Sequence, residues 1–267
     1  MSSNFKELSG FSWNWIDIHV RDRESWSRKR ISLEYQCTYL TRRTLGAISS
    51  ILDAGCGGAF LNRYIEGSKQ AVSYVGIDRS IASLTAARTR FPGKPFLLSD
   101  VRPLPFQTNT FNLAYSVDVV IHHPAPYEVV TELYRVAQYV LLRIRTADIT
   151  DVFTARYRDY ENPPQVNEAV HQFFPLNQVL EFLKALEPTP ASIRYRIHKR
   201  YPRTYDAHLY KNKAAFSSYF VTDFLIAKGP PKKLPIPVTD DTDYSLVQTA
   251  LRRLLLRNHR SYISTTA

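Results

Sequence analysis

Short apolar runs alternate along the first half of the chain with segments whose apolar residues recur every three to four positions. The runs cover residues 47–52, 72–77, 96–98, 111–120 and 139–144, and they have the length of buried strands. The segments between them, within 60–65, 81–88 and 129–137, have helical spacing. Strands that alternate with helices in this way predict a parallel sheet with helices on both faces. We therefore expect an α/β, Rossmann-like, doubly wound fold.

The second half of the chain departs from this alternation. Residues 146–174 hold several aromatic side chains and a Pro-Pro step without a regular period, whereas residues 176–186 repeat apolar positions as one face of a helix. Further strands are predicted at 193–198 and 219–227. Prolines and lysines at 229–237 predict a stiff linker, and residues 244–255 predict a basic amphipathic helix.

A glycine-rich turn joins the first strand to the first helix of this pattern. Gly55, Gly57 and Gly58 follow the strand that ends near Asp53. Glycine lets the backbone approach a ligand closely, and the N-terminus of the next helix offers free N–H groups. The turn therefore predicts a ligand site, although an ordinary tight connection between strand and helix has the same sequence.

Acidic residues stand at or near the ends of the predicted strands. They are Asp53, Asp78, Asp100 and Asp118. In open parallel sheets, ligands bind outside the carboxyl ends of the strands. Asp78 follows the glycine turn by about one βαβ unit, which is where a carboxylate can hold the hydroxyls of a ribose.

Four motifs follow one another in the order Asp53-x-Gly55-Cys56-Gly57, Gly76-Ile77-Asp78-Arg79-Ser80, Asp100-Val101-x-x-Leu104-Pro105-Phe106 and Phe111-Asn112-Leu113-Ala114-Tyr115. With them the chain resembles the class I S-adenosylmethionine-dependent methyltransferases, and most closely the type-11 methyltransferase domain. The likeness covers roughly residues 45–150 and, more loosely, the chain up to 229. It implies a mostly parallel sheet of seven strands with an antiparallel last strand, in which 193–198 and 219–227 form the final antiparallel pair.

The resemblance also implies the cofactor S-adenosylmethionine and a role for each matching residue. The methionine end of the cofactor would lie beside Asp53, Gly55, Cys56 and Gly57. Asp78 would hold both ribose hydroxyls, and Arg79 would lie against the adenine face. Asp100 would accept the adenine amino group, and Val101 would offer its backbone N–H to the ring. Ser116 and Val117 would line the floor near the sulfonium.

Two positions depart from the family pattern. Ala59 stands where many members have a third glycine, and we expect alanine to fit there because the backbone should already be helical. Residues 135–138 run straight into the fifth strand without the usual Lys-Pro-Gly-Gly turn, which leaves the geometry of that junction open.

His122 and His123 follow the fourth strand and are candidate general bases. Histidine titrates near neutrality and can take a proton from a hydroxyl or an amine. The alternative is that one imidazole only caps the turn. Adjacent residues cannot easily face one ion and no third ligand is evident, so we expect no metal site.

Composition changes this picture mainly through charge. The 267 residues carry a net charge of +11 and an isoelectric point near 9.6, which favours polyanionic partners such as RNA or else reflects a generally basic surface. Two cysteines offer neither a disulfide framework nor a metal pair. The sequence has no apolar run of spanning length and no signal-peptide pattern, so we expect a cytoplasmic protein.

We expect three parts along the chain. Residues 1–46 form an N-terminal arm and helix, for which a lid over the cofactor is one hypothesis and packing on the sheet edge the other. Residues 47–229 form the cofactor-binding domain, with a substrate-binding insert near 146–175. Residues 230–267 form the linker and the C-terminal helix.

The function that these features favour is methyl transfer from S-adenosylmethionine to oxygen, nitrogen or carbon of a small molecule by in-line displacement. A general base is needed only if the acceptor must lose a proton. The charge keeps a tRNA or rRNA methyltransferase as an alternative, and further alternatives are a protein methyltransferase and a non-catalytic binding partner built on the cofactor fold. The sequence predicts neither the acceptor nor an oligomeric state.

Overall fold

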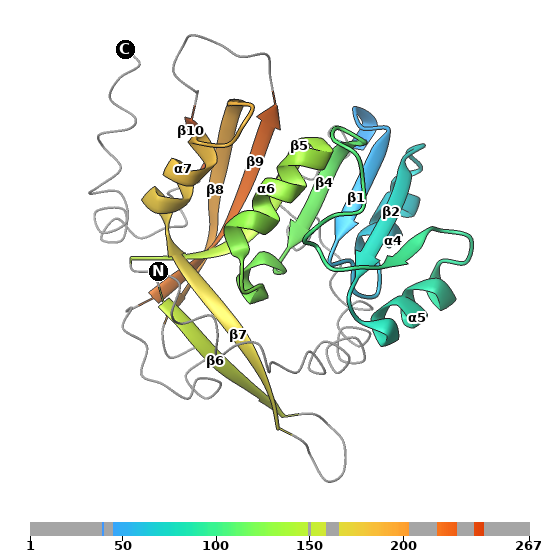
Figure 1. Cartoon of the computed structure of the whole chain (residues 1–267), viewed down its shortest axis with the longest axis horizontal. Coiled ribbons are helices and arrows are strands. Elements are labelled where there is room, and N and C mark those ends of the chain that lie inside the picture. The colour runs from blue at the N-terminus through green and yellow to red at the C-terminus, as the bar shows by residue number, and fades with distance from the viewer. Residues whose placement is uncertain are drawn as a thin grey trace.

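The computed structural model describes Tyr39 and residues 45–148, 151–158, 166–202, 218–228 and 238–242; side chains are described for the same ranges except 151–169, 198–202 and 218. The N-terminal arm, most of the helix predicted up to residue 45, the linker at 229–237 and the C-terminal amphipathic helix lie outside these ranges. Figure 1 shows a twisted sheet that runs across the molecule with helices packed against it.

The first half of the chain forms the expected alternation. Its elements are β1 (Ser50–Ala54), α4 (Phe60–Ser68), β2 (Ser73–Asp78), α5 (Ile81–Arg90), β3 (Phe96–Leu98) and β4 (Phe111–Val117). A 3-10 turn, η2 (Val120–His122), leads into α6 (Pro126–Val136), and β5 (Ala137–Ala147) follows. The periodicity of apolar residues therefore predicted the type of each element.

The second half of the chain adds a hairpin, a helix and three strands. The hairpin consists of β6 (Asp151–Arg158) and β7 (Val166–Pro175), which pair antiparallel. It occupies the segment in which we predicted the substrate insert but no strands. The remaining elements are α7 (Leu176–Lys184), β8 (Pro190–Pro202), β9 (Ser218–Lys228) and β10 (Val238–Asp240).

The sheet has the order β10-β8-β9-β5-β4-β1-β2-β3. In addition, β7 pairs with the last two residues of β5, and β6 pairs with β7. The strands from β3 to β5 are parallel, whereas β9 pairs antiparallel with both β5 and β8. The mostly parallel sheet and the antiparallel final pair are confirmed. The expected count of seven is too low, because the structure describes ten strands, including the hairpin and β10.

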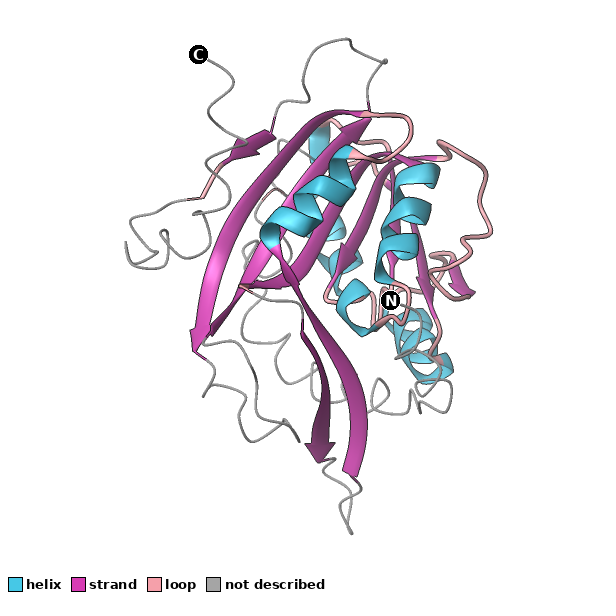
Figure 2. Ribbon diagram, turned by 60° about the vertical axis from the view of Figure 1, so that its left-hand side comes forward, coloured by secondary structure: helices cyan, strands magenta, loops and turns pink. Residues whose placement is uncertain are grey.

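Helices cover both faces of the sheet (Figure 2). On one face α6 and α7 contribute Val129, Leu133, Val179 and Leu183 to a large apolar core. On the other face α4 packs Leu61 and Ile65 against β1, β2 and β4 in a second apolar cluster. This double burial explains why the central strands read as continuous apolar runs. Within the described ranges, no helix has the length and apolar character needed to cross a membrane.

Several predicted boundaries were wrong, among them those of β8, which extends over Pro190–Pro202 rather than 193–198. The fourth strand ends at Val117 rather than Val120, because Asp118 has a positive φ of 57° and the chain then enters η2. The first strand begins at Ser50 rather than Ala47. The fifth strand is longer than predicted and includes residues 137–147.

The junction between α6 and β5 contains no loop residue, since the helix ends at Val136 and the strand begins at Ala137. The carbonyl of Arg135 accepts the N–H of Asn109 at 3.0 Å and the ammonium of Lys228 at 3.0 Å. A helix end leaves carbonyls without intrahelical partners. Groups from two other segments therefore replace the glycine turn that this chain lacks.

Candidate functional site

Two glycines shape the turn between β1 and α4. Gly55 and Gly57 have φ of 76° and 52°, a conformation that glycine adopts at little cost. A Cβ on Gly55 would lie 2.3 Å from Cγ2 of Val119, so only glycine fits there. A Cβ on Gly57 would meet no atom of the described residues within 4 Å, so none of them covers the backbone at this position.

Asp78 fastens this turn to the end of β2. Its Oδ2 accepts the N–H of Gly57 at 2.8 Å, and its Oδ1 accepts the N–H of Ser80 at 2.9 Å. The carbonyl of Ile77 accepts the N–H groups of Gly55 and Cys56 at 2.9 and 2.8 Å. Asp78 is only 6% exposed, and these backbone donors help to stabilise its charge.

The far side of the turn departs from our expectation. Ala59 has φ 58° and ψ 42°, which is left-handed rather than helical, so the prediction that alanine would sit in helical backbone was wrong. This conformation costs a non-glycine residue roughly 1–2 kcal/mol. Arg90 braces the same region, since its Nη1 donates to the carbonyl of Gly58 at 2.7 Å and its guanidinium lies 4.9 Å from the ring centre of Phe60.

Asp53 lies beneath the turn and is 4% exposed. The hydroxyl of Tyr74 donates to its Oδ2 at 2.7 Å. Burial raises the pKa of Asp53 to about 7, the nearby charge of Asp78 adds to this, and the Tyr74 hydrogen bond opposes it. Burial also raises the pKa of the Cys56 thiol, so Cys56 is a neutral, buried thiol in this wall of the site.

Asp100 gathers three neighbours just after β3. Arg79 Nη1 lies 3.4 Å from its Oδ2, and its Oδ1 accepts the N–H of Val101 at 2.7 Å. Burial acts to raise the pKa of Asp100, but His123 and Arg79 outweigh it and lower that pKa. The Val101 amide, which the resemblance assigns to the adenine ring, is bonded here to the carboxylate beside it; its role toward a cofactor stays a prediction.

Ser116 and Val117 close β4, next to the glycine turn in the sheet order. Ser116 is fully buried, and its hydroxyl has no hydrogen-bond partner among the residues that the structure describes. A buried hydroxyl without a partner costs free energy, so a group that could bond to it would be stabilised there. Val117 is half-buried and lies in register with Arg143 on β5.

The two adjacent histidines have different surroundings. His123 is 5% exposed, its Nδ1 accepts the N–H of Ala125 at 3.0 Å, and its Nε2 lies 3.5 Å from Oδ1 of Asp100. This matches the alternative in which one imidazole caps the turn before α6. His122 is half-buried, and its Nδ1 lies 2.6 Å from the carbonyl of Val170 on β7.

The histidine tautomers follow from these partners. A carbonyl only accepts, so Nδ1 of His122 carries the proton and Nε2 carries the lone pair. His122 therefore retains a basic nitrogen, whereas Nδ1 of His123 is occupied as an acceptor. The ring of His171 packs edge-on against His122, with ring centres 4.6 Å apart.

The structure thus places the predicted residues in two groups. Asp53, Gly55, Cys56, Gly57 and Asp78 surround the turn, and Arg79, Asp100, Val101 and His123 gather beside β3. Sequence reasoning missed Tyr74, Arg90 and Gln172. In the sequence, Tyr74 looks like an ordinary strand residue and Arg90 like an exposed helix residue. Their contacts with Asp53 and Gly58 are therefore visible only in the folded structure.

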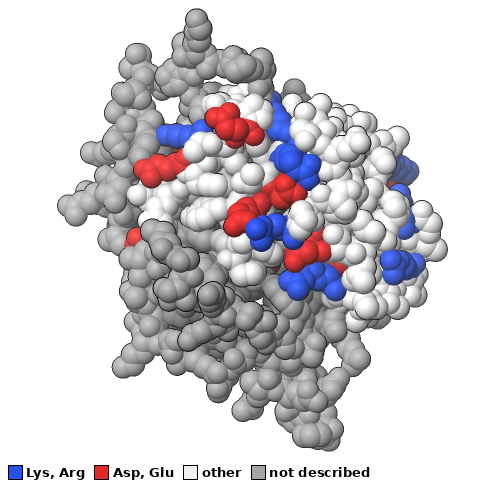
Figure 3. All heavy atoms as spheres, viewed as in Figure 1, with Lys and Arg blue, Asp and Glu red and all other residues white. Residues whose placement is uncertain are grey.

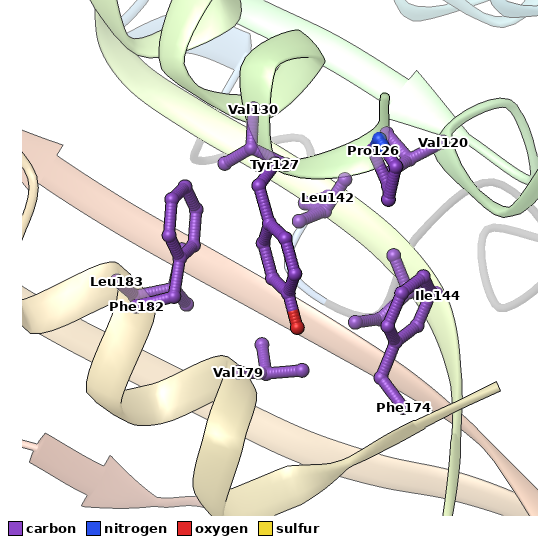
Figure 4. A pocket seen from close by; sticks show the side chains of 10 residues that line it. All are labelled: Val120, Pro126, Tyr127, Val130, Leu142, Ile144, Phe174, Val179, Phe182 and Leu183. Atoms are coloured by element: carbon purple, nitrogen blue, oxygen red, sulfur yellow. The ribbon is translucent and has the colours of Figure 1, made fainter. Parts of the chain in front are cut away.

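A separate hollow lies on the opposite face, between α6 and α7 (Figure 4). It contains about 270 Å³ of empty space, open to solvent, and is lined by apolar side chains including Val130, Val179 and Phe182. The ring of Tyr127 extends across it, 4.5 Å from the ring centre of Phe182. None of the predicted cofactor residues lines this hollow.

Comparison with known proteins gives one family and several relatives. Residues 52–139 match the family model of a methyltransferase domain. Over 99 residues the chain is 33% identical to the malonyl-[acyl-carrier protein] O-methyltransferase of Salmonella typhimurium, a match that covers 37% of this chain and 39% of that protein. The matched stretch thus spans about two fifths of the relative's length.

Solved structures of methyltransferases are similar at lower identity. One is an S-adenosylmethionine-dependent methyltransferase from Mesorhizobium loti, with 15% identity, a TM-score of 0.44, and coverage of 69% of this chain and 93% of that one. Another is the 1,6-didemethyltoxoflavin-N1-methyltransferase of Burkholderia thailandensis, solved with its substrate and S-adenosylhomocysteine. It is 16% identical, has a TM-score of 0.43, and the match covers 81% of this chain and 90% of that one.

Proposed function

We propose that this chain is a class I S-adenosylmethionine-dependent methyltransferase that transfers the methyl group to a small-molecule acceptor, because residues 52–139 match the family model of a methyltransferase domain. The observation that carries the proposal is the glycine turn, whose backbone at Gly57 is covered by none of the described residues and donates a hydrogen bond to the carboxylate of Asp78. The methylated atom, whether oxygen, nitrogen or carbon, depends on the acceptor.

The residues present fit this cofactor in their chemistry. Each Asp78 oxygen accepts one backbone N–H, and carboxylate oxygens are the kind of acceptor that a ribose hydroxyl can donate to. Asp100 presents a carboxylate that is one-third exposed and suits an amino donor such as that of adenine.

When bound, S-adenosylmethionine supplies a methyl carbon activated by positive sulfur. The chain must then align the acceptor with that carbon and exclude water, and alignment alone can contribute roughly 7–11 kcal/mol. If the acceptor is a hydroxyl or an amine, His122 can receive its proton at Nε2. His122 is therefore our candidate base, whereas the engaged Nδ1 of His123 makes that residue a poor one.

Asp78→Ala tests the cofactor assignment. We expect the Kd for S-adenosylmethionine to rise at least tenfold, because hydrogen bonds to a charged group contribute roughly 1.5–3 kcal/mol and the turn also loses its anchor. Isothermal calorimetry measures this, with Asp118→Ala as the control carboxylate on the same edge of the sheet. Wild-type affinity in the Asp78 variant would overturn the ribose assignment and would favour a non-catalytic partner.

The acceptor can be found by incubating the protein with methyl-labelled cofactor and fractionated small molecules, then detecting labelled products by mass spectrometry. The relative's name describes O-methylation of a malonyl group on an acyl carrier protein, so carboxylic acids in free and carrier-bound form belong in the screen. If none of the small-molecule fractions becomes labelled, that result would count against a methyltransferase acting on small molecules.

A tRNA or rRNA methyltransferase is the second candidate, favoured by the net charge of +11. If RNA is the acceptor, log K for binding should fall linearly with log salt, with a slope that reflects several phosphate contacts. Filter binding of total tRNA between 50 and 300 mM salt, about the range in which such slopes are steep, measures this. A flat response would exclude the RNA alternative.

A further inference from the structure

His123 is buried at the point where three parts of the molecule meet. It follows η2, precedes the N-terminus of α6, and faces Asp100 after β3. The side chain is only 5% exposed. A buried polar ring is stable only if its nitrogens have partners, so the contacts of His123 define its role.

Both ring nitrogens of His123 have such partners. The amide of Ala125 can only donate, so Nδ1 is the acceptor of their 3.0 Å hydrogen bond. In the neutral ring the proton is consequently on Nε2, which lies 3.5 Å from Oδ1 of Asp100. The imidazole therefore presents a donor to the carboxylate and cannot accept a proton at Nδ1 without breaking the turn.

The carboxylate that His123 faces is the one we assign to the adenine amino group. Oδ1 of Asp100 faces His123 and Val101, whereas Oδ2 lies 3.4 Å from Arg79. These contacts fix the rotation of a carboxylate that is one-third exposed. Without His123, the Asp100 side chain would be held only by its own neighbour Val101 and by Arg79, which is 38% exposed.

His123 is also tied to the hairpin. Its carbonyl accepts Nε2–H of Gln172 on β7 at 2.5 Å, and Gln172 is 3% exposed. The neighbouring His122 donates to the carbonyl of Val170 on the same strand. The two histidines thus fasten η2 to β7, the strand of the segment in which we predicted the acceptor insert.

We propose that His123 is a positioning residue that orients the Asp100 carboxylate toward the cofactor's adenine and couples that carboxylate to the β6–β7 hairpin. The inference rests on the proposed function. It assigns His123 a task in cofactor binding, separate from proton transfer, and it makes the hairpin and the adenine end of the site parts of one connected unit.

Two substitutions separate the two ring contacts. In His123→Asn the amide oxygen can replace Nδ1 and keep the bond from Ala125, but the side chain is too short to reach Asp100. In His123→Gln the terminal NH₂ can replace Nε2 and keep the contact with Asp100, but the acceptor near Ala125 is lost. Either loss is expected to be local, because neither variant adds volume to the buried site.

The test is calorimetric titration with S-adenosylhomocysteine, together with the Tm of the protein alone. We expect His123→Asn to raise the Kd about five- to tenfold with little change in Tm, since a hydrogen bond to a charged group is lost. We expect His123→Gln to restore the Kd to within about twofold while lowering the Tm. Glu128→Gln, at an exposed position in the first turn of α6 outside both groups of site residues, is the control and should leave the Kd unchanged.

A ligand without the adenine amino group tests whether the His123→Asn defect acts through that group. In S-inosylhomocysteine an oxygen replaces the adenine amino group, so the ligand loses the amino donor that we assign to Asp100. The wild type and His123→Asn should bind this analogue with similar Kd values. A His123→Asn defect that is equally large for both ligands, or absent for both, overturns the proposal. Failure of the wild type to bind S-adenosylhomocysteine would instead overturn the proposed function, and the inference with it.

Discussion

Asp53 shows how burial can set the charge of a single side chain in this protein. Its ordinary pKa of 3.8 rises to about 7 because the carboxylate is removed from water, and Asp78 adds a second negative charge nearby. The Tyr74 hydroxyl and the Cys56 thiol face it as neutral groups, their pKa values being raised by burial. The folded protein therefore holds a proton on Asp53 under conditions in which the unfolded chain has lost it.

This difference predicts a pH-dependent loss of stability. Between about pH 4 and pH 7 the folded state binds more protons at Asp53 than the unfolded state, so the free energy of unfolding falls as the pH rises. Above pH 7 the full cost, about 2–4 kcal/mol, is present. Asp53→Asn keeps an acceptor for Tyr74 and removes the titration.

We therefore expect Asp53→Asn to gain stability relative to wild type on going from pH 5 to pH 8. Urea unfolding at both pH values measures the two differences. Asn112→Asp, which introduces a carboxylate at a site that is only half-buried, serves as a control for general charge effects. A constant difference between wild type and Asp53→Asn at the two pH values would show that Asp53 is ionised throughout.

For single residues, the sequence predicted which residues belong to the site better than it predicted their backbone conformations and neighbours. The resemblance named Asp78 and Gly57, and the structure joins them through one hydrogen bond. It could not reveal that Ala59 adopts a left-handed conformation, because nothing in the local pattern distinguishes it from the first residue of a helix. Nor could spacing reveal the neighbours of His123, which come from the loop after β3, the N-cap position of α6 and the strand β7.

At the scale of elements, α5 supports the glycine turn from outside. Arg90 in its last turn reaches the carbonyl of Gly58 and covers the ring of Phe60, the first residue of α4. Arg88, two positions earlier, donates instead to the carbonyl of Phe96 on β3 at 3.0 Å. The two arginines are thus a natural pair for comparison, since each binds one backbone carbonyl but only one of them touches the turn.

We predict that Arg90→Met raises the Kd for S-adenosylhomocysteine several-fold, on the order of one lost charge-assisted hydrogen bond. Arg88→Met should change this Kd by less than about twofold, because β3 keeps its pairing with β2. Fluorescence or calorimetric titration of both variants gives the comparison. Equal effects in the two variants would show that α5 acts only through general stability.

The elements themselves could be predicted to different extents. Helices and strands up to β5 follow from periodicity, since both faces of the central sheet are buried. The hairpin was missed because Tyr157, Tyr160 and the Pro-Pro step gave no alternating pattern, and its strands are specified by pairing with each other. The β10 strand was missed because it has three residues and follows a proline-rich stretch.

At the scale of the whole molecule, a buried ion pair joins the parallel part of the sheet to its antiparallel part. Arg143 on β5 contacts Asp223 on β9 through two hydrogen bonds of 2.6 and 3.0 Å. Their side chains are 5% and 0% exposed. Beside them the hydroxyls of Thr146 and Thr222 bond across the same two strands at 2.7 Å.

Removing one member of this pair should be more harmful than removing both. Asp223→Leu leaves the Arg143 charge buried, and we expect a loss of about 3–5 kcal/mol in the free energy of unfolding. The double variant Arg143→Met/Asp223→Leu should be more stable than the single one. Chemical denaturation of the three proteins measures this, and additive losses would contradict the coupling.

Acidic and basic side chains are mixed over the described part of the face that carries α6 (Figure 3). There Arg102 pairs with Glu128, and Arg135 pairs with Glu132 at 2.7 Å. The net charge of +11 therefore gives no single-sign patch on the described part of this face.

The short strand β10 has a practical consequence for anyone who trims this chain for expression. It covers part of β8, the outermost long strand, and is clasped there by Arg196, whose Nε donates to the carbonyl of Asp241, and by the Tyr39 hydroxyl on Asp241. Ending the chain after residue 229 would remove β10 and expose the backbone of β8 at residues 193–195. Unpaired strand edges pair with other chains, so we expect the shortened protein to aggregate more readily.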